Sequence, residues 1–286
     1  MPFAGIQPNR IESRKAAVFM VFPPEFWWIF LAAALVCSIG FRKYVWFISI
    51  GYGLSIAAMG IALPIVYSGR LDLPRILMCI LMLGYGLRLG GFLLFRELRS
   101  AAYNNNMKGE ISDGSHMKFP IKVMLWLSCV LLYLMMSSPA MYRFANDAPS
   151  DGWLFAGEAV MLAGILLEAL SDKQKSAAKK VNPGRFCDSG LFRIVRCPNY
   201  LGELILWTGM LLSGVSALQT AGQWIVAVIG WLGIVYVMFS GARRLELRQD
   251  RNYGADPEYR AYVKKVPILL PLVPLYSVKK HKWLVG

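Results

Sequence analysis

The chain has 286 residues, of which 56% are hydrophobic and 17% are charged, and its mean hydropathy is +0.46. A soluble domain usually carries about 25% charged residues, and several apolar runs here exceed the roughly 18 residues that indicate a membrane-spanning helix. A soluble enzyme, a disulfide-stapled secreted domain and a disordered chain are therefore excluded. The net charge of +14 indicates orientation in a membrane and contact with anionic lipid before it indicates an anionic ligand.

Seven apolar segments are predicted to cross the membrane as helices, because a helix satisfies all of its backbone groups internally. In chain order they cover residues 24–41, 44–67, 74–95, 119–139, 153–170, 199–218 and 222–242. The expected fold class is all-α: a polytopic integral membrane protein with seven transmembrane helices. We expect residues 1–286 to form a single membrane domain.

Positive charge is distributed unequally between the two sides that seven spans define. Of the 31 Lys and Arg residues, 24 fall on the side of the C-terminus and six on the other side, while Arg88 lies inside a span. Cytoplasmic loops carry an excess of Lys and Arg, so the C-terminus is predicted to be cytoplasmic.

Cysteine and histidine do not form a metal-binding pattern. Three of the five cysteines lie inside apolar runs, no two are spaced as a CxxC pair, and both histidines, His116 and His281, are far from any cysteine in the sequence. We therefore expect neither a metal site nor a disulfide framework.

The most specific segment runs from Asp188 to Glu203 and reads DSGLFRIVRCPNYLGE. Pro198 suits the first turn of a helix, and Asn199 and Glu203, four residues apart, would then share one helix face. A carboxyl group at the start of an apolar span is costly unless it meets a cavity or a partner. The structural alternative is a helix cap with a carboxylate that faces the lipid headgroups.

The order of two arginines, Pro, Asn, Tyr, Gly and Glu in this segment resembles the Arg-His-Pro-Asn-Tyr-x-Gly-Glu signature of the steroid 5α-reductase and membrane sterol reductase superfamily, which includes bacterial members. The isoprenylcysteine methyltransferases, with a similar Arg-His-Pro-x-Tyr element, are a looser relative. The resemblance covers residues 168–271 well and the third span weakly. Cys197 stands where the superfamily usually has histidine.

The resemblance implies an NADPH-dependent oxidoreductase that acts on a CH–CH bond. Such an enzyme would transfer a hydride to a carbon–carbon double bond of a 3-oxo-Δ4-steroid, a sterol or an isoprenoid. The expected partners are this hydrophobic small molecule and membrane lipid, with no nucleic acid. We expect a monomer in a bacterial inner membrane.

The resemblance also implies that the cofactor binds to two cytoplasmic segments, at about 171–198 and 243–271. Acids at the end of the fifth span would hold the adenosine, basic side chains the phosphates, and Asn199 the nicotinamide end. The residues so implied are Glu168, Asp172, Lys179, Arg185, Arg193, Asn199, Arg244 and Tyr253. A structural alternative stays open for each group. The two acids would then only make the end of a helix polar, and the basic cluster would contact anionic lipid.

The third span carries a full charge, Arg88, three residues after Tyr85 and therefore on the same helix face. An ionised side chain inside a span is by default a functional candidate, and a structural ion pair, for example with Glu203, is the alternative. The resemblance implies that Tyr85 donates a hydrogen bond to the substrate carbonyl. The catalytic residues expected are Tyr85, Glu203 and Arg88.

The second span lacks the Gln-Glu pair that the steroid enzymes place beside the enone carbonyl. Apart from Trp46, its hydrogen-bonding side chains are the hydroxyls of Tyr44, Ser49, Tyr52, Ser55 and Tyr67. Either another acid takes over, or the substrate is not an ordinary 3-oxo-steroid. The glycines near Tyr85 allow close helix approach or leave room for a flat ligand, and the sequence does not choose between these. They are Gly84, Gly86, Gly90 and Gly91.

Two other functions use the same features. One is a membrane methyltransferase that uses S-adenosylmethionine. Such an enzyme needs fewer phosphate-binding cations than an enzyme that binds a dinucleotide. The other is a non-enzymatic sterol- or lipid-binding protein, which needs no polar cluster on the cytoplasmic side.

The charge distribution makes a prediction about topology. A reporter fused after Gly286 is expected to be cytoplasmic, and one inserted near Asn146 external. The opposite pattern in a fusion assay would overturn both the orientation and the cytoplasmic placement of the expected cofactor-binding segments.

Overall fold

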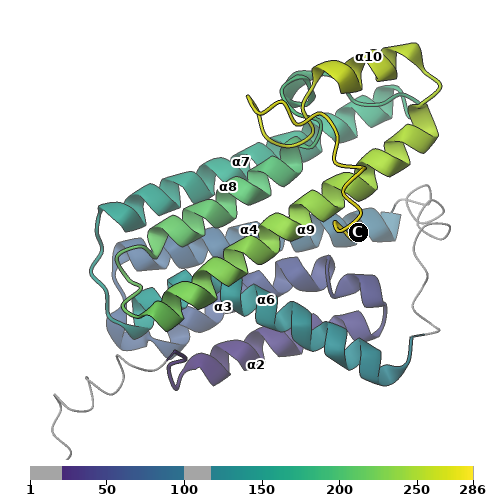
Figure 1. Ribbon diagram of the computed structural model, residues 1–286. Coiled ribbons are helices and arrows are strands. Elements are labelled where there is room, and N and C mark those ends of the chain that lie inside the picture. The colour runs from purple at the N-terminus through teal and green to yellow at the C-terminus, as the bar shows by residue number, and fades with distance from the viewer. Residues whose placement is uncertain (1–20, 100–116, 286) are drawn as a thin grey trace, which may run out of the picture. The chain divides into compact units, whose positions relative to one another are not determined.

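The computed structural model describes residues 21–99 and 117–285, which are helical apart from turns and connections, with no β-strand in these two ranges. The expectation of an all-α fold is therefore confirmed (Figure 1). The helices are α2 (Phe26–Cys37), α3 (Ile50–Val66), α4 (Leu73–Arg99), α6 (Phe119–Ala145), α7 (Gly152–Val181), α8 (Pro198–Ser213), α9 (Ala221–Tyr253) and α10 (Pro257–Lys265).

Within residues 21–99 and 117–285, five helical segments are long and apolar enough to cross a membrane, which agrees with a polytopic membrane protein. They are Tyr44–Val66, Leu73–Leu98, Phe119–Ala145, Gly152–Val181 and Ala221–Tyr253. The two other expected spans are shorter: Phe26–Phe41 is a short apolar helical segment, and α8 has 16 residues. Because a crossing helix needs about 20 residues, the total of seven spans stays a prediction, as do the cytoplasmic C-terminus and the bacterial inner membrane. The N-terminal residues and most of the 96–118 connection, which enter the charge count, lie outside the described ranges.

Two segments that were expected to be loops are largely helical. Helix α7 continues to Val181 and α9 to Tyr253, about ten residues beyond the predicted ends of these spans. The added residues are rich in Lys, Arg, Gln, Glu, Leu and Ala, which have high helix propensity. At about 1.5 Å per residue, the 33 residues of α9 exceed a hydrocarbon core of about 30 Å. The polar ends of both helices therefore have the length to project beyond the bilayer.

The chain forms two compact units, which are described here one at a time. The first comprises Met1–Leu154 with Ser213–Gly230, and the second Phe155–Leu212 with Trp231–Gly286. The expected single membrane domain stays a prediction.

In the first unit, α3 and α4 touch backbone to backbone at glycines. A Cβ atom added to Gly86 would lie 2.5 Å from the amide nitrogen of Ala57 and would also overlap the carbonyl oxygen of Gly53. By contrast, a Cβ atom at Gly84 would meet no atom within 4 Å. Small residues permit this close approach between helices in lipid, where apolar side chains gain little by leaving the membrane. Gly86 and Gly90 therefore serve helix packing, and Gly84 and Gly91 do not contact a neighbour.

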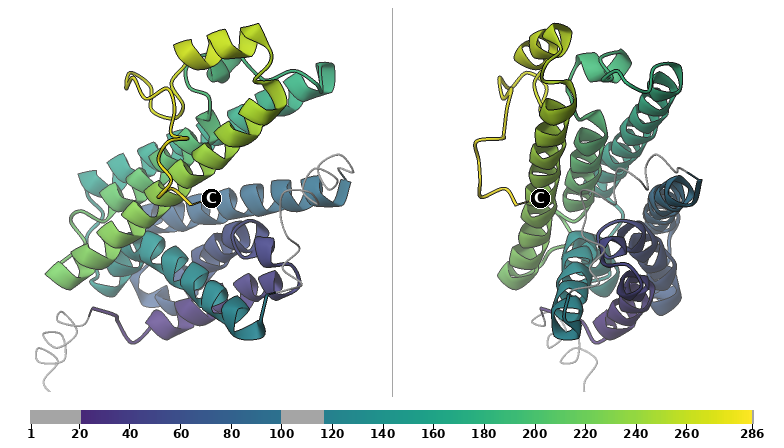
Figure 2. Two further views of the ribbon diagram at one scale, coloured as in Figure 1. Left: turned by 45° about the vertical axis from the view of Figure 1, so that its right-hand side comes forward. Right: turned by 90° about the vertical axis from the view of Figure 1, so that its right-hand side faces the viewer.

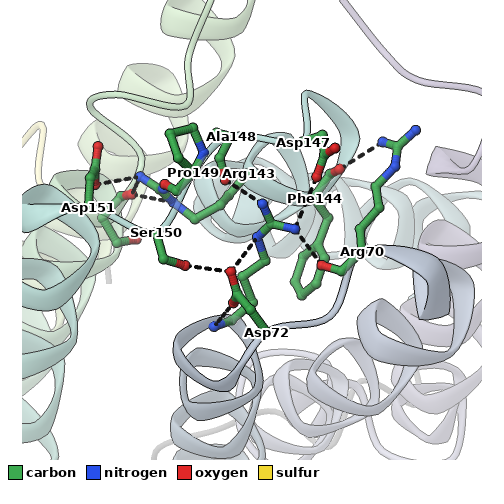
Figure 3. Close-up of polar contacts among 11 residues, drawn as sticks. Arg70, Asp72, Arg143, Phe144, Asp147, Ala148, Pro149, Ser150 and Asp151 are labelled. Atoms are coloured by element: carbon green, nitrogen blue, oxygen red, sulfur yellow. Dashed lines mark hydrogen bonds and ion pairs between the residues drawn. The ribbon is translucent and has the colours of Figure 1, made fainter.

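The first unit also contains a cluster of three arginines, shown in Figure 3. Arg70 donates to the carbonyl oxygens of Phe144 and Ala145, at 2.8 and 2.6 Å. These carbonyls belong to the last turn of α6, where no intrahelical donor is available. The third arginine, Arg75, likewise donates to a backbone carbonyl oxygen. Arg70, Arg75 and Arg143 are the cations predicted on the external side after the N-terminal segment, and their hydrogen bonds to backbone carbonyls give them a structural role.

Arg143 is the most enclosed member of this cluster, with its side chain fully buried. It donates to the carbonyl oxygen of Pro149 at 2.5 Å and, through two nitrogens, to that of Ser213 at 2.6 and 3.0 Å. Its Nη2 also lies 3.5 Å from Asp151 Oδ1. A buried guanidinium is tolerated where hydrogen bonds and a counter-charge replace its hydration. Arg143 thus joins the connection between α6 and α7 to the end of α8.

In the second unit, α7 and α8 pack antiparallel through glycines spaced seven residues apart (Figure 1). A Cβ atom at Gly164 would lie 2.5 Å from the carbonyl oxygen of Gly202, and one at Gly209 would lie 2.6 Å from the amide nitrogen of Met161. A Cβ atom at Gly202 would lie 2.7 Å from the amide nitrogen of Glu168. This contact fixes Glu168 beside the first turns of α8.

The two glycine environments on α4 predict opposite effects of one methyl group. Gly86→Ala should destabilise the protein by about 1–3 kcal/mol, because the new methyl overlaps backbone atoms of α3 that cannot rotate away. Gly84→Ala has open space and should leave stability unchanged or raise it by up to about 1 kcal/mol. Thermal unfolding of both variants in detergent tests this, and equal midpoints would contradict it.

Candidate functional site

The entry to α8 is held by a short extended pairing with the chain that follows α10. The amide of Arg196 donates to the carbonyl oxygen of Pro267, and that of Cys197 to the carbonyl oxygen of Ile268, both at 2.9 Å. Pro198 then begins α8, as predicted. The motif is therefore anchored directly before the residues that the resemblance singles out.

A buried ion pair reinforces this entry. Arg196 Nη2 lies 3.0 Å from Glu246 Oε1, and the two side chains are 1% and 3% exposed. The other carboxylate oxygen of Glu246 accepts from the amides of Val278 and Lys279, at 2.9 and 3.1 Å. Arg196 also donates to the carbonyl oxygen of Tyr276. The pair tolerates burial because hydrogen bonds satisfy both carboxylate oxygens of Glu246 and the Nη2 atom of Arg196.

This pair is not predicted from the sequence, where Arg196 is one of the two arginines of the signature segment and one cation of a basic cluster, and Glu246 is not a candidate residue. The sequence does contain a hint of this pair, because Glu246 lies inside the basic stretch ARRLELRQD. No local sequence rule, however, predicts that it pairs with an arginine 50 residues earlier.

Three buried polar atoms near the start of α8 have no hydrogen-bond partner in the described part of the chain. They are Nε and Nη1 of Arg196 and Oδ1 of Asn199. A buried polar group left without a partner costs about 1–3 kcal/mol, so groups of this kind call for an explanation. Two cationic donors and one amide acceptor suit a ligand that carries both an anionic group and a hydrogen-bond donor.

Predicted residues from three helices lie around the first turns of α8. Glu168 of α7 is buried and adjoins Gly202. Glu203 is also buried. The ring of Tyr200, in the same turns of α8, packs against α9 at Gly241, where an added Cβ atom would lie 3.3 Å from the ring, and Arg244 follows Gly241 by one turn. The structure thus brings Glu168, Asn199, Glu203 and Arg244 to one region of the second unit. Asp172 follows Glu168 by one turn and is half-buried.

Two of the predicted phosphate ligands bind the protein itself. Lys179 Nζ donates to the carbonyl oxygens of Pro183 and Arg185, at 3.0 and 2.5 Å, and to the Tyr253 hydroxyl at 2.8 Å. Arg185 pairs with Glu258 and Asp188, at 2.5 and 2.8 Å, and these hydrogen bonds raise the pKa of its guanidinium. Both side chains therefore shape the connection between α7 and α8.

Arg193 and Arg244, in contrast, are exposed and form no ion pair or hydrogen bond with the residues described. Their guanidinium groups are thus available to an anion, which arginine binds well through two parallel hydrogen bonds.

An aromatic cluster closes this end of the second unit. The ring of Phe186 lies 5.3 Å from those of Tyr259 and Tyr262 and 6.0 Å from that of Tyr253. Tyr259 donates to Asp250 and Tyr262 to the carbonyl oxygen of Phe192. Burial raises the pKa of both phenols, which stay neutral. Tyr259 and Tyr262 therefore pack α10 against this cluster.

Cys197 occupies the position where the superfamily usually has histidine. Its side chain is buried, and burial raises the pKa of the thiol to about 11. The group is therefore neutral at physiological pH and supplies neither a cation nor a thiolate nucleophile.

The first unit contains a pair of buried tyrosines at the expected catalytic position. Tyr85 is 1% exposed, and its hydroxyl donates to that of Tyr52 at 2.9 Å. The ring of Tyr52 lies 5.0 Å from that of Tyr133, whose hydroxyl donates to the carbonyl oxygen of Phe47 at 2.7 Å. The second span therefore offers a phenol to Tyr85, although it lacks the Gln-Glu pair.

The predicted site residues divide between the two units. Tyr85 and Arg88 belong to the first, and Glu203 belongs to the second with all the expected cofactor residues. The approach of Tyr85 to the cofactor residues and the pairing of Arg88 with Glu203 stay predictions.

The fold and these contacts define the class: a polytopic all-helical membrane protein with a polar, arginine-rich site at the start of one helix. Residues 37–266 match the family described as "Protein of unknown function (DUF1295)". The chain belongs to this family.

Three curated relatives share part of the sequence. An uncharacterized protein of Schizosaccharomyces pombe is 29% identical over 161 residues, 49% of this chain and 45% of the relative. The steroid 5-alpha-reductase DET2 of Arabidopsis thaliana is 31% identical over 104 residues, 34% of each chain. That of Gossypium hirsutum is 29% identical over 125 residues, 42% of this chain and 43% of the relative.

The match thus spans less than half the length of each of these relatives. No solved structure matches the chain. Together with the family, the two plant proteins place the chain in the steroid 5α-reductase-like superfamily.

The Arg196–Glu246 pair predicts a large difference between two glutamate variants. Glu246→Gln should destabilise the protein by about 3–5 kcal/mol, because it leaves the buried charge of Arg196 without a counter-charge. Glu258→Gln, which removes an exposed partner of Arg185, should have little effect. Denaturation in detergent measures both, and a Glu246→Gln protein as stable as wild type would contradict the prediction.

Proposed function

We propose that the protein is a membrane-embedded, NADPH-dependent reductase that transfers a hydride to a carbon–carbon double bond of a steroid-like, sterol or isoprenoid substrate. The observation that carries the proposal is that, at the start of α8, buried polar atoms of Arg196 and Asn199 have no hydrogen-bond partner among the described residues. Partial similarity to two steroid 5-alpha-reductases supports a reductase over a methyltransferase.

The residues at this site fit a phosphorylated dinucleotide. The unpartnered nitrogens of Arg196 and the exposed guanidinium groups of Arg193 and Arg244 suit phosphate oxygens. Asn199 Oδ1 suits the amide donor of a nicotinamide. When bound, NADPH supplies the hydride, and the protein supplies binding and orientation.

The remaining predicted cofactor residues would complete the binding. Glu168 and Asp172 would accept hydrogen bonds from the ribose hydroxyls and the adenine amino group. Lys179, Arg185 and Tyr253 would line the phosphates, which requires their present contacts with the connection to rearrange.

Tyr85 would act on the substrate carbonyl in the first unit. Its hydroxyl would donate to the oxygen on which negative charge develops, a contact that is stronger in the transition state than in the ground state. When Tyr85 donates to the substrate, the hydrogen bond between the two tyrosines can change direction. The Tyr52 hydroxyl then rotates and donates to the Tyr85 oxygen, 2.9 Å away. Hydrogen bonds in such a chain strengthen one another. Arg88, on the same face of α4, would stabilise the negative charge that develops on this oxygen. Glu203 would act as a polar group at the nicotinamide end of the cofactor site in the second unit.

Removing one hydroxyl tests the role of Tyr85. Tyr85→Phe should lower kcat for reduction of an enone by roughly 10²–10³-fold and leave NADPH binding nearly unchanged. Tyr133→Phe is a matched control, because the Tyr133 hydroxyl bonds a backbone carbonyl in the same cluster, and it should keep most of the activity. Wild-type turnover by Tyr85→Phe would make Tyr85 a packing residue.

The basic residues predict a cofactor preference. The protein should bind NADPH more tightly than NADH by roughly 1–2 kcal/mol or more, the scale of a charge-assisted contact with the 2′-phosphate. Arg193→Gln and Arg244→Gln should narrow this difference. Calorimetry measures the affinities, and equal values for the two cofactors would refute the preference.

The same protein preparation separates the alternative functions. Ligand that binds the folded state raises the thermal midpoint by mass action. Stabilisation by S-adenosylmethionine in place of NADPH would indicate a methyltransferase, and stabilisation by sterols alone a lipid-binding protein.

A further inference from the structure

The chain after α10 returns along α9 and is bound to it by specific contacts. Figure 2 shows this segment passing from the end of α9 to the middle of that helix. Arg243 Nε donates to the carbonyl oxygen of Lys279 at 3.2 Å, and its Nη1 to that of Leu284 at 3.3 Å. Val278 and Leu284 are buried, 1% and 2% exposed. Residues 278–285, called the C-terminal strap below, lie beyond the part that matches the family.

An aromatic pair fixes the far end of the strap. The ring of Trp283 stacks on that of Tyr236, with centroids 6.1 Å apart. The Tyr236 hydroxyl donates to the carbonyl oxygen of Trp283 at 3.0 Å and accepts from the amide of Val285 at 3.3 Å. Trp283 nevertheless keeps 66% of its surface exposed. Its indole is thus rigidly held and faces outward.

The strap also presents unpaired basic side chains. Lys280, His281 and Lys282 are exposed and form no ion pair or side-chain hydrogen bond with any residue that the structure describes. Lys279 differs, because it pairs with Asp250 at 2.8 Å, a hydrogen bond that raises the pKa of its ammonium group. The two lysines next to the exposed indole therefore have no counter-charge of their own.

The order of side chains along this surface follows the order of layers in a bilayer. Leu232 of α9 is exposed and apolar, Tyr236 follows one turn later with Trp283 stacked on it, and the lysines of the strap adjoin Trp283. Aromatic rings concentrate at the boundary between hydrocarbon and headgroups, and basic residues beyond it attract anionic headgroups. Tyr236 is the sixteenth residue of α9, which suits a position near the end of a span of about 20 residues.

We propose that the C-terminal strap is a binding site for the headgroup of an anionic phospholipid, in the leaflet on the C-terminal side. Lys280 and Lys282 bind the phosphate, and Trp283 packs against the upper part of the acyl chains. The contacts of the strap with Glu246, Arg243 and Tyr236 hold these groups in place before lipid arrives, so little freedom is lost on binding. The proposal rests on membrane insertion and does not depend on reductase activity.

The test uses the full-length protein in detergent and measures bound phosphatidylglycerol and phosphatidylcholine by native mass spectrometry. The wild type should retain phosphatidylglycerol in preference to phosphatidylcholine. The double variant Lys280→Gln/Lys282→Gln should bind phosphatidylglycerol roughly 25-fold more weakly, because each basic residue near an anionic surface contributes a factor of about five. Trp283→Ala should weaken both lipids.

A matched control is Lys264→Gln/Lys265→Gln, which removes two neighbouring exposed lysines from the last turn of α10. This variant should bind phosphatidylglycerol as the wild type does. An equal loss in both double variants, or no loss in the strap variant, would overturn the proposal. Competition by inorganic phosphate at the same concentration as lipid would also overturn it, because the site would then recognise a free anion.

Discussion

Close backbone contact at glycine is the constraint on which the helix pairs of both units depend. Lipid tails are as apolar as leucine, so helices in a membrane gain by fitting tightly and not by leaving water. In the first unit the contact at Gly86 holds α4 against α3, which puts Tyr85 within hydrogen-bonding distance of Tyr52. In the second, the contact between Gly164 and Gly202 puts Glu168 beside the start of α8.

Buried charge is the second organising feature. Two buried arginines are stabilised in the same way, by backbone carbonyl oxygens and a nearby carboxylate. Arg143 and Arg196 are both enclosed, and each is hydrogen-bonded to backbone carbonyls that helix ends or connections leave without donors. Each also has one carboxylate close by, Asp151 and Glu246. The two arginines differ in one respect: two nitrogens of Arg196 remain without a partner among the described residues, and these are the atoms that the proposed function assigns to a ligand.

Much of the architecture follows from local sequence. Apolar length predicts the five long helices, and Pro198 predicts the start of α8, because these depend on the bilayer thickness and on the geometry of proline. Helix ends were predicted less well. Helix α7 runs to Val181 and α9 to Tyr253, since hydropathy detects the edge of the membrane, whereas a helix of Lys, Ala and Arg continues into water.

The sequence by itself determined the class of the protein, the resemblance carried by residues 188–203, and the presence of basic residues where a dinucleotide could bind. Tertiary structure decided how those residues are used. It showed that Lys179 and Arg185 bind the protein's own connection while Arg193 and Arg244 stay exposed. It also joined Arg196 to Glu246 and Tyr85 to Tyr52, 50 and 33 residues apart in the chain. Local patterns report helix length and polarity, but a hydrogen bond between distant residues depends on how the helices pack.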